Sequence, residues 1–265
     1  MSLEKIAEVY LMQSIEDYSC LVTGGGSGIG LGIASHLAKN GAKVTITGRR
    51  RENLERACKS IGKNCSFIVG DVTSENDRNA MIHGAVQHGK GLHGLVNAAG
   101  NMLRGSISDL DPADILDLLN TNVVAGMRLT GLCVSHLQKS GGGVLFVGSI
   151  HTRRSFPGAS PYAASKGAVE VLTKVLAAEL GPLGIRVNCV IPGAVPTEIN
   201  IRAGLAVSEE ENIERLTSMI PEHPLGRIGT PQEIAEASEY LLRAEWTTGA
   251  SIVVDGGLSL GVSNK

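Results

Sequence analysis

Three side chains, Ser149, Tyr162 and Lys166, have the types and spacing needed to move a proton on or off an alcohol oxygen. Tyr162 and Lys166 are four residues apart, so a helix places both on one face within reach of each other. Ser149 follows an apolar run of strand length, residues 144–148, and its hydroxyl would donate a hydrogen bond to a carbonyl oxygen. The pattern predicts a tyrosine general acid/base assisted by a lysine and a serine. Taken alone, Tyr162 and Lys166 also fit an ordinary pair on a helix surface.

The chemistry sets an energetic requirement on Tyr162. A free tyrosine titrates near pH ~10, so a general base working near neutrality needs its pKa lowered by roughly three units, or about 4 kcal/mol. An ammonium about 6 Å away, at an effective dielectric constant of about 20, supplies roughly 2.8 kcal/mol. Because Lys166 alone falls short, we expect a second cation, such as an oxidised nicotinamide ring, to supply the rest.

A strand, a glycine-rich turn and a helix open the folded part of the chain. Residues 18–23 fit a strand and residues 31–39 a helix, with a turn of the spacing Gly24-x-x-x-Gly28-x-Gly30 between them. Bare N–H groups at a helix N-terminus bind anions, and glycines let a pyrophosphate lie against the main chain. We therefore expect a dinucleotide here, although such a turn can also bind nothing. The expected contacts are Gly24, Ser27, Gly28, Ile29 and Gly30.

The end of the second predicted strand, residues 43–47, carries three cations. Where an NAD site usually places an acid for the ribose hydroxyls, this chain has Gly48 followed by Arg49, Arg50 and Arg51. Cations at the start of the next helix oppose its dipole unless an anion sits there, and a 2′-phosphate is that anion. NADP(H) is favoured, with Arg49 as the main contact beside Arg50. NAD(H) and a solvated charged turn are the alternatives.

The later strand ends also suit a ligand. Asp71 follows the third strand and either accepts from the adenine amino group or caps the helix predicted over 74–88. Asn122 lies within the helical run 111–138, where an amide competes for backbone hydrogen bonds; a kink holding a water and a surface side chain are both open. The further cofactor contacts expected are Asp71, Val72, Asn97, Ala98, Gly100, Pro192, Gly193, Val195 and Thr197, with Tyr162 and Lys166.

Length and composition bound the fold. With 265 residues, 43% apolar and 19% charged, the chain fits one soluble domain with a large core. Strands alternate with helices and the chemistry lies at strand ends, which predicts an α/β fold with a Rossmann-type doubly wound parallel sheet. We expect an N-terminal arm over residues 1–17, the Rossmann domain over 18–265, and a substrate lid of two short helices over about 196–225.

The charge and cysteine content argue against a nucleic-acid-binding, a membrane or a metal-binding protein. A net charge of −2 gives no basic surface for nucleic acid or an anionic membrane, and no apolar run reaches membrane-spanning length. The five cysteines show no metal-ligand spacing, so we expect reduced thiols, no metal and a cytoplasmic protein.

The motifs together resemble the classical short-chain dehydrogenase/reductase family over about residues 18–260. They are Thr23-Gly24-x-x-x-Gly28-x-Gly30, Asp71-Val72, Asn97-Ala98-Ala99-Gly100, Asn122, Ser149, Tyr162-x-x-x-Lys166, Pro192-Gly193 and Asp255-Gly256-Gly257. One departure is Ala98, where the family commonly has a second Asn, which puts a local hydrogen bond in doubt. Another is Gly148, where the family has Ser.

This resemblance implies roles for the four residues of the predicted catalytic group. Tyr162 is the general acid/base, and Lys166 bonds the nicotinamide ribose and lowers the tyrosine pKa. Ser149 polarises the substrate carbonyl, and Asn122 holds a water that relays protons from Lys166 to solvent. The resemblance also implies a homotetramer, and a basic residue in the place of Arg49 goes with NADP(H).

The predicted function is an NADP(H)-dependent oxidoreductase that interconverts a small secondary alcohol and a ketone. The alternatives are an NAD(H)-dependent dehydrogenase of the same fold and a non-catalytic dinucleotide-binding scaffold. His151, Arg153 and Arg154 follow Ser149 in a loop expected to border the pocket, where they would hold an acidic substrate group. A solvated loop or a subunit contact is the alternative for them.

Overall fold

The computed structural model describes residues 14–262, which alternate strands and helices. The strands are β1 (Ser19–Thr23), β2 (Lys43–Gly48), β3 (Cys65–Val69), β4 (Gly94–Asn97), β5 (Gly143–Val147), β6 (Arg186–Pro192) and β7 (Ser251–Val254). The α-helices are α2 (Gly28–Lys39), α3 (Arg51–Ile61), α4 (Glu75–Gly89), α5 (Pro112–Leu119), α6 (Ala125–Ser140), α7 (Ser160–Leu180), α8 (Ile199–Arg202), α9 (Glu209–Thr217) and α10 (Pro231–Arg243). Most of the expected N-terminal arm, residues 1–13, lies outside the described residues.

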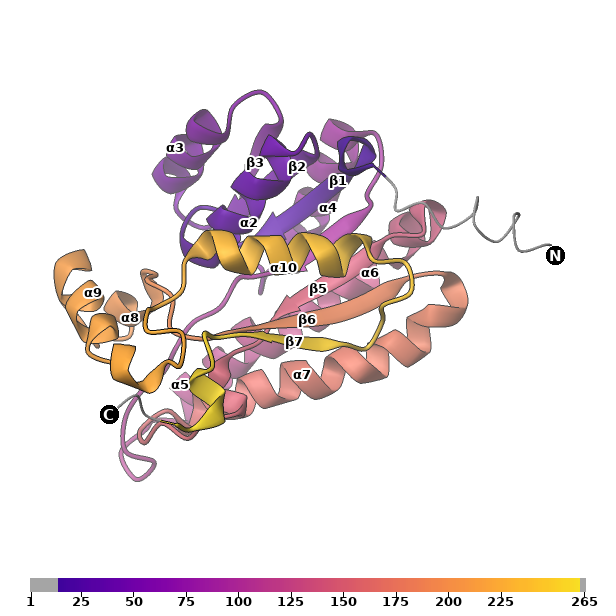
Figure 1. The fold of residues 1–265 in the computed structure, drawn as a ribbon. Coiled ribbons are helices and arrows are strands. Elements are labelled where there is room, and N and C mark those ends of the chain that lie inside the picture. Colours follow the sequence, from indigo (N-terminus) through magenta and orange to yellow (C-terminus); the bar gives the residue numbers. More distant parts are fainter. Residues whose placement is uncertain (1–13, 263–265) are drawn as a thin grey trace, which may run out of the picture.

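One parallel sheet holds the described strands, in the order β3-β2-β1-β4-β5-β6-β7 (Figure 1). The strand order changes direction between β1 and β4, so a crevice opens there at the carboxyl ends of the strands. The short helices α8 and α9 lie beyond this edge of the sheet. The predicted Rossmann-type sheet in a single domain is confirmed.

The central strands bury both of their faces. In β1, Cys20 and Val22 pack in the layer that contains α2, α3 and α10, whereas Leu21 between them packs with α4, α6 and α7. All three side chains are fully buried. Burial on both faces explains the continuous apolar strands of the sequence, and each such side chain contributes about 1.5–3 kcal/mol.

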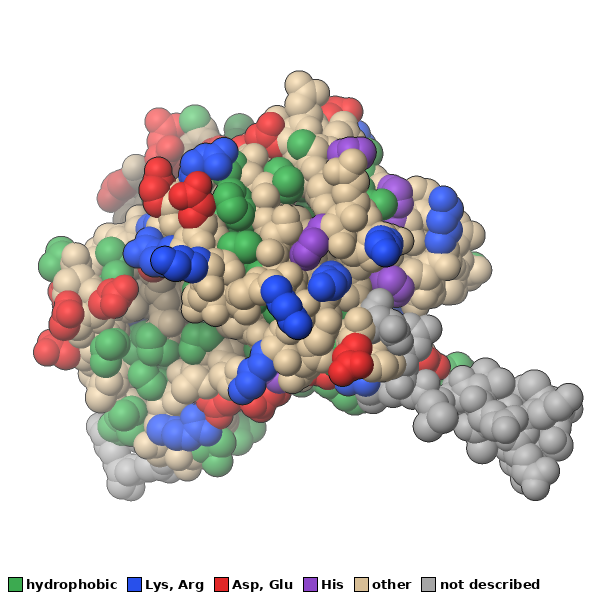
Figure 2. Space-filling model, turned by 90° about the horizontal axis from the view of Figure 1, so that it is seen from above, with side chains coloured by type: hydrophobic (Ala, Val, Ile, Leu, Met, Phe, Trp, Pro, Cys, Tyr) green, Lys and Arg blue, Asp and Glu red, His purple; other side chains and the backbone are tan. Residues whose placement is uncertain are grey.

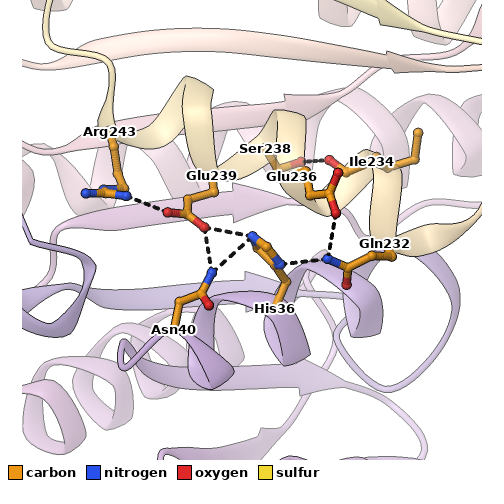
Figure 3. A network of polar contacts seen from close by, with 8 residues as sticks. All are labelled: His36, Asn40, Gln232, Ile234, Glu236, Ser238, Glu239 and Arg243. Atoms are coloured by element: carbon orange, nitrogen blue, oxygen red, sulfur yellow. Dashed lines mark hydrogen bonds and ion pairs between the residues drawn. The ribbon is translucent and has the colours of Figure 1, made fainter. Parts of the chain in front are cut away.

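A polar network joins α2 to α10 on one face of the sheet (Figure 3). Glu239 of α10 accepts hydrogen bonds from Arg243 Nη1 at 2.5 Å and from Asn40 Nδ2 at 2.8 Å. Its carboxylate also lies 2.7 Å from His36 Nε2, and Gln232 Nε2 lies 2.9 Å from the other nitrogen of that ring. Burial raises the pKa of Glu239, but these bonds outweigh it and hold the pKa below its ordinary value.

The helical run after β4 is interrupted, as its sequence predicts. Residues Asn120–Val124 form a π-helical turn between α5 and α6. A π turn adds one residue to the helix, and here it carries Asn122 inward to a buried position. The kink is therefore present, and Asn122 is not a surface side chain.

The surface is of mixed sign. On the face shown in Figure 2, Lys and Arg side chains are spread across the middle, acidic side chains gather mainly toward the left, and histidines lie toward the right. The described residues contain no group of metal-ligating side chains, and none of their helices is long and apolar enough to cross a bilayer. All five cysteines are free thiols.

Candidate active site

The end of β5 and the first turns of α7 bring the three predicted catalytic side chains together. Ser149 follows β5 in an extended conformation, and Tyr162 and Lys166 lie one turn apart on α7. All three are buried. The Lys166 ammonium donates a hydrogen bond to the Val147 carbonyl, 2.8 Å away at the end of β5, and so ties the helix to the strand.

Burial sets the charge states of the tyrosine and the lysine. It raises the pKa of Tyr162, and a hydrogen bond with Ser149 only partly offsets this. Burial also lowers the pKa of Lys166 to about 8. The ammonium donates to the Val147 carbonyl and lies 5.7 Å from the centroid of the Tyr162 ring. A lowered tyrosine pKa that needs both Lys166 and a second cation stays a prediction.

Asn122 supports this group from the π-helical turn. Its Oδ1 accepts from the Asn101 N–H at 2.8 Å, and its Nδ2 donates to the Asn101 carbonyl at 2.9 Å. Nδ2 also lies 3.0 Å from Ser165 Oγ in α7. A Cβ added to Gly100 would lie 3.2 Å from Asn122 Oδ1 and 3.8 Å from Lys166 Nζ, so the amide and the ammonium border the same small space.

His151 is a hydrogen-bond partner of Ser149. Its Nδ1 lies 3.0 Å from Ser149 Oγ, and its backbone N–H donates to the same oxygen at 3.3 Å. The ring stands edge-on to Tyr162, with centroids 4.9 Å apart. Burial, followed by the charges of Arg104, Lys166 and Arg215, lowers the pKa of His151 to about 4. The ring is neutral at pH 7, so it supplies a hydrogen bond rather than the predicted positive charge for a substrate acid.

One cavity of about 330 Å³ joins the catalytic group to the glycine-rich turn. Most of the predicted site residues line it: Gly24, Ser27, Gly28, Ile29, Gly30, Arg49, Arg50, Asp71, Val72, Ala98, Gly100, Ser149, His151, Tyr162, Lys166, Pro192, Gly193, Val195 and Thr197. Its volume is within the range of small-molecule sites.

The start of α2 fits the pyrophosphate of a dinucleotide. Within this helix the first turn has no acidic side chain, and its leading N–H groups have no helical acceptor. The N-cap residue Ser27 makes no capping bond; its Oγ accepts from Arg50 Nη2 at 3.3 Å. Gly24 (φ +66°) and Gly28 (φ +55°) adopt left-handed conformations, which glycine takes without strain.

The cations after β2 have different partners. Arg49 is 62% exposed, and among the described residues its one ion pair is a loose contact with Asp71, at 3.7 Å. Arg50 pairs closely with Glu198, at 2.6 Å. The N-terminus of α4 is capped by Ser74 and not by Asp71. The Oδ1 atom of Asp71 instead accepts hydrogen bonds from the backbone N–H and the hydroxyl of Thr73. Arg49 is the cation best placed for a further anion.

Four residues of the sequence prediction point elsewhere. Arg153 pairs with Glu170 of α7 and lies outside the cavity lining, and Arg154 pairs with Glu222. Asn97 turns away, with its Nδ2 3.3 Å from Thr130 Oγ1. Asn122 lies behind the cavity rather than in its lining. At the departure from the family pattern, the backbone N–H groups of Ala98 and Ala99 donate to Thr23 Oγ1.

The segment over 196–225, the predicted lid, contributes several residues to the cavity lining. Asn212 Nδ2 donates to the Thr197 carbonyl at 3.0 Å, and its Oδ1 accepts from Asn200 Nδ2 at 2.9 Å, so α8 and α9 are linked to the end of β6. The lining residues missed by the sequence reasoning include Arg104, Arg202 and Arg215. Two of them lie in the expected lid, but nothing in their spacing indicates that they face inward.

The fold and site define a class. The chain matches the family model described as enoyl-(acyl carrier protein) reductase over residues 24–259. It belongs to the short-chain dehydrogenase/reductase family, as the motifs predict, and is an oxidoreductase acting on alcohols and ketones.

Its relatives span most of the chain. Human dehydrogenase/reductase SDR family member 4 is 35% identical over 89% of this chain and 86% of its own length. The 2-(S)-hydroxypropyl-CoM dehydrogenase 3 of Xanthobacter autotrophicus is also 35% identical, over 90% of this chain and 95% of its own. A crystal structure of 3-ketoacyl-(acyl-carrier-protein) reductase from Brucella melitensis complexed with NADH has a TM-score of 0.84 and 31% identity, covering 93% of this chain and all of that one.

Proposed function

We propose that this protein is an NADP(H)-dependent oxidoreductase that interconverts a secondary alcohol and a ketone. The observation that carries this is the continuous cavity, which runs from the exposed Arg49 and the bare N-terminus of α2 to Ser149, Tyr162 and Lys166. A small-molecule ketone or alcohol fits at the catalytic end. NADP(H) is preferred over NAD(H) because Gly48 offers no acid for the ribose hydroxyls.

The residues of the chain divide the chemistry. A nicotinamide cofactor, when bound, supplies or accepts the hydride. Ser149 donates a hydrogen bond to the carbonyl oxygen, and Tyr162 gives that oxygen its proton in reduction or takes it in oxidation. Lys166 bonds the nicotinamide ribose and returns a proton to Tyr162. Asn122 holds the water through which that proton reaches solvent.

The other contacts position the cofactor. The backbone around Pro192, Gly193 and Val195 and the Thr197 hydroxyl bond the carboxamide and so fix which face of the ring meets the substrate. Asp71 and Val72 flank the adenine, and Ala98 and Gly100 flank its ribose. The segment over 196–225 acts as the lid that closes on both ligands.

We propose a homotetramer in the cytoplasm. Val171 and Val175 on α7 and Met127 on α6 are exposed apolar side chains, which a neighbouring copy would cover. Five free thiols suit a reducing compartment.

A non-catalytic scaffold would have no need of the buried Ser149–Tyr162 pair.

The deciding experiment measures reduction of a ketone panel with NADPH and with NADH, in wild type and in Tyr162→Phe. The panel includes a 2-enoyl thioester, because the family model is described as an enoyl reductase. We expect ketone reduction, and a loss in kcat of about a thousandfold in the variant with the cofactor Kd nearly unchanged. Turnover that survives the substitution would contradict the proposed role of Tyr162.

A further inference from the structure

We propose that Arg104 and Arg215 form an anion subsite at the catalytic end of the cavity, which selects ketones and secondary alcohols that carry a carboxylate, sulfonate or phosphate group. This inference rests on the proposed function and names its substrate class. It assigns the recognition of a substrate anion to side chains other than His151 and Arg153.

The cavity is strongly positive although the chain has a formal net charge of −2. Its charged lining residues are the cations Arg49, Arg50, Arg104, Lys166, Arg202 and Arg215 and the carboxylates Asp71 and Glu198. Both carboxylates are already paired, with Arg49 and Arg50. The excess positive charge therefore faces the ligands.

Two of the cations belong to the catalytic end. Arg104 lies in the loop between β4 and α5, and its Nη2 donates to the Pro157 carbonyl at 2.7 Å, in the loop that joins Ser149 to α7. Arg215 comes from α9 in the segment over the cavity. The charges of both arginines reach His151, whose ring stands edge-on to Tyr162. A group held between them would lie beside the reacting carbonyl.

Arg202 belongs to the other end. Its guanidinium lies near Arg50, Glu198 and Arg49, and its Nη2 donates to the Gly100 carbonyl at 3.4 Å. The phosphates of a cofactor account for these cations. They do not account for Arg104 and Arg215.

Neither arginine at the catalytic end is neutralised within residues 14–262. Arg215 makes no side-chain hydrogen bond or ion pair to any described residue, and Arg104 has only its bond to Pro157, although a guanidinium has five N–H donors. Nearby, Arg153 and Arg154 are both paired with glutamates. Burial, and then the charge of Arg215, lowers the pKa of Arg104. Two half-buried like charges are unfavourable until an anion joins them, and a planar guanidinium pair matches such an oxyanion group.

The test compares matched acidic and neutral ketones with saturating NADPH. The pairs are acetoacetate and 4-oxopentanoate with their methyl esters, 2-oxopropylphosphonate with its dimethyl ester, and 2-oxopropanesulfonate with methylsulfonylacetone. The pairs cover the three anion types and two chain lengths. The variants are Arg215→Gln and Arg104→Gln, with Lys63→Gln as the control because Lys63 is exposed and outside the cavity lining.

We expect wild type to favour at least one anionic ketone, with a kcat/KM about tenfold or more above that of its neutral partner. Arg215→Gln should lower this acid-to-neutral ratio about tenfold, Arg104→Gln should lower it as well, and Lys63→Gln should leave it unchanged. Two results would overturn the subsite while leaving the redox function standing. One is an acid-to-neutral ratio of one for every pair in wild type, and the other is an unchanged ratio in Arg215→Gln.

A binding readout separates the two proposals if no ketone is reduced. With saturating NADP⁺ present, methylphosphonate should raise the Tm of wild type and of Lys63→Gln but not that of Arg215→Gln. That result would support the subsite even though the redox function had failed. The same rise in all three proteins, or no rise in any, would overturn it.

Discussion

The ammonium nitrogen of Lys166 lies 5.7 Å from the centroid of the Tyr162 ring, and its hydrogen bond goes to the Val147 carbonyl. In the protein alone this arrangement leaves the tyrosine pKa raised by burial. We therefore expect the base form of Tyr162 to depend on a further positive charge, which a bound oxidised cofactor would supply.

This relationship predicts how Tyr162 titrates. We expect the phenol absorbance of wild type minus Tyr162→Phe to show no ionisation step below pH ~10 without a ligand. With oxidised cofactor bound, a step should appear at lower pH, because the positive charges of the nicotinamide ring and of Lys166 both favour the phenolate. The same step at the same pH with and without cofactor would contradict this coupling.

Arg49→Asp should shift the cofactor preference. It removes a charged hydrogen-bond donor to the 2′-phosphate, worth about 1.5–3 kcal/mol, so the NADP(H)-to-NAD(H) ratio of kcat/KM should fall roughly 10- to 100-fold. Arg51→Asp is the matched control, since Arg51 pairs with Glu55 and lies outside the cavity lining. Equal shifts in both variants would mean that only overall charge matters.

His151 predicts a particular loss of stability in acid. Its pKa is about 4 in the folded protein and near 6.5 when unfolded, so between these values the unfolded chain binds more protons. Stability should fall as pH drops from 6.5 to 4, by on the order of 2–3 kcal/mol at the lower end. His151→Gln should lack this part of the decline in urea titrations. Parallel pH profiles for the two proteins would show that the ring titrates normally.

Glu239→Gln tests the network between α2 and α10. The carboxylate accepts bonds from Arg243 and Asn40 and contacts His36, so its loss should cost about 1–3 kcal/mol of unfolding free energy at pH 7. Because the folded pKa is lowered, the stabilisation exists above the unfolded pKa and is lost as pH falls through the folded one. The difference should therefore shrink in acid. Glu179→Gln serves as control, because Glu179 is exposed on α7 and its side chain makes no hydrogen bond or ion pair to a described residue. An equal loss there would argue against the network.

Local patterns were enough to predict much of the fold. The strands predicted over 18–23 and 43–47 and the helix predicted over 74–88 agree with β1, β2 and α4 to within one residue at each end. The helix expected from residue 31 begins earlier, at Gly28, because its first turn consists largely of glycines and so has no apolar periodicity.

The limits of sequence reasoning lie in the loops. The tyrosine, lysine and serine could be found because regular elements fix their spacing. The neutrality of His151 and the outward pairing of Arg153 with Glu170 depend on how one irregular loop folds. Arg104 and Arg215 line one cavity although they lie more than a hundred positions apart in the sequence, and no local pattern contains that information.

The extra residue in the π-helical turn at Asn120–Val124 sets the position of Asn122 relative to α6, so the number of residues in this turn matters. Deleting any one residue from this turn would restore regular α-helical winding and rotate the preceding segment by about 100° relative to α6. The amide of Asn122 would swing away from Asn101 and from α7. A homologue or an engineered variant that lacks one residue of this turn should keep the sheet but lose the proposed water site at Asn122.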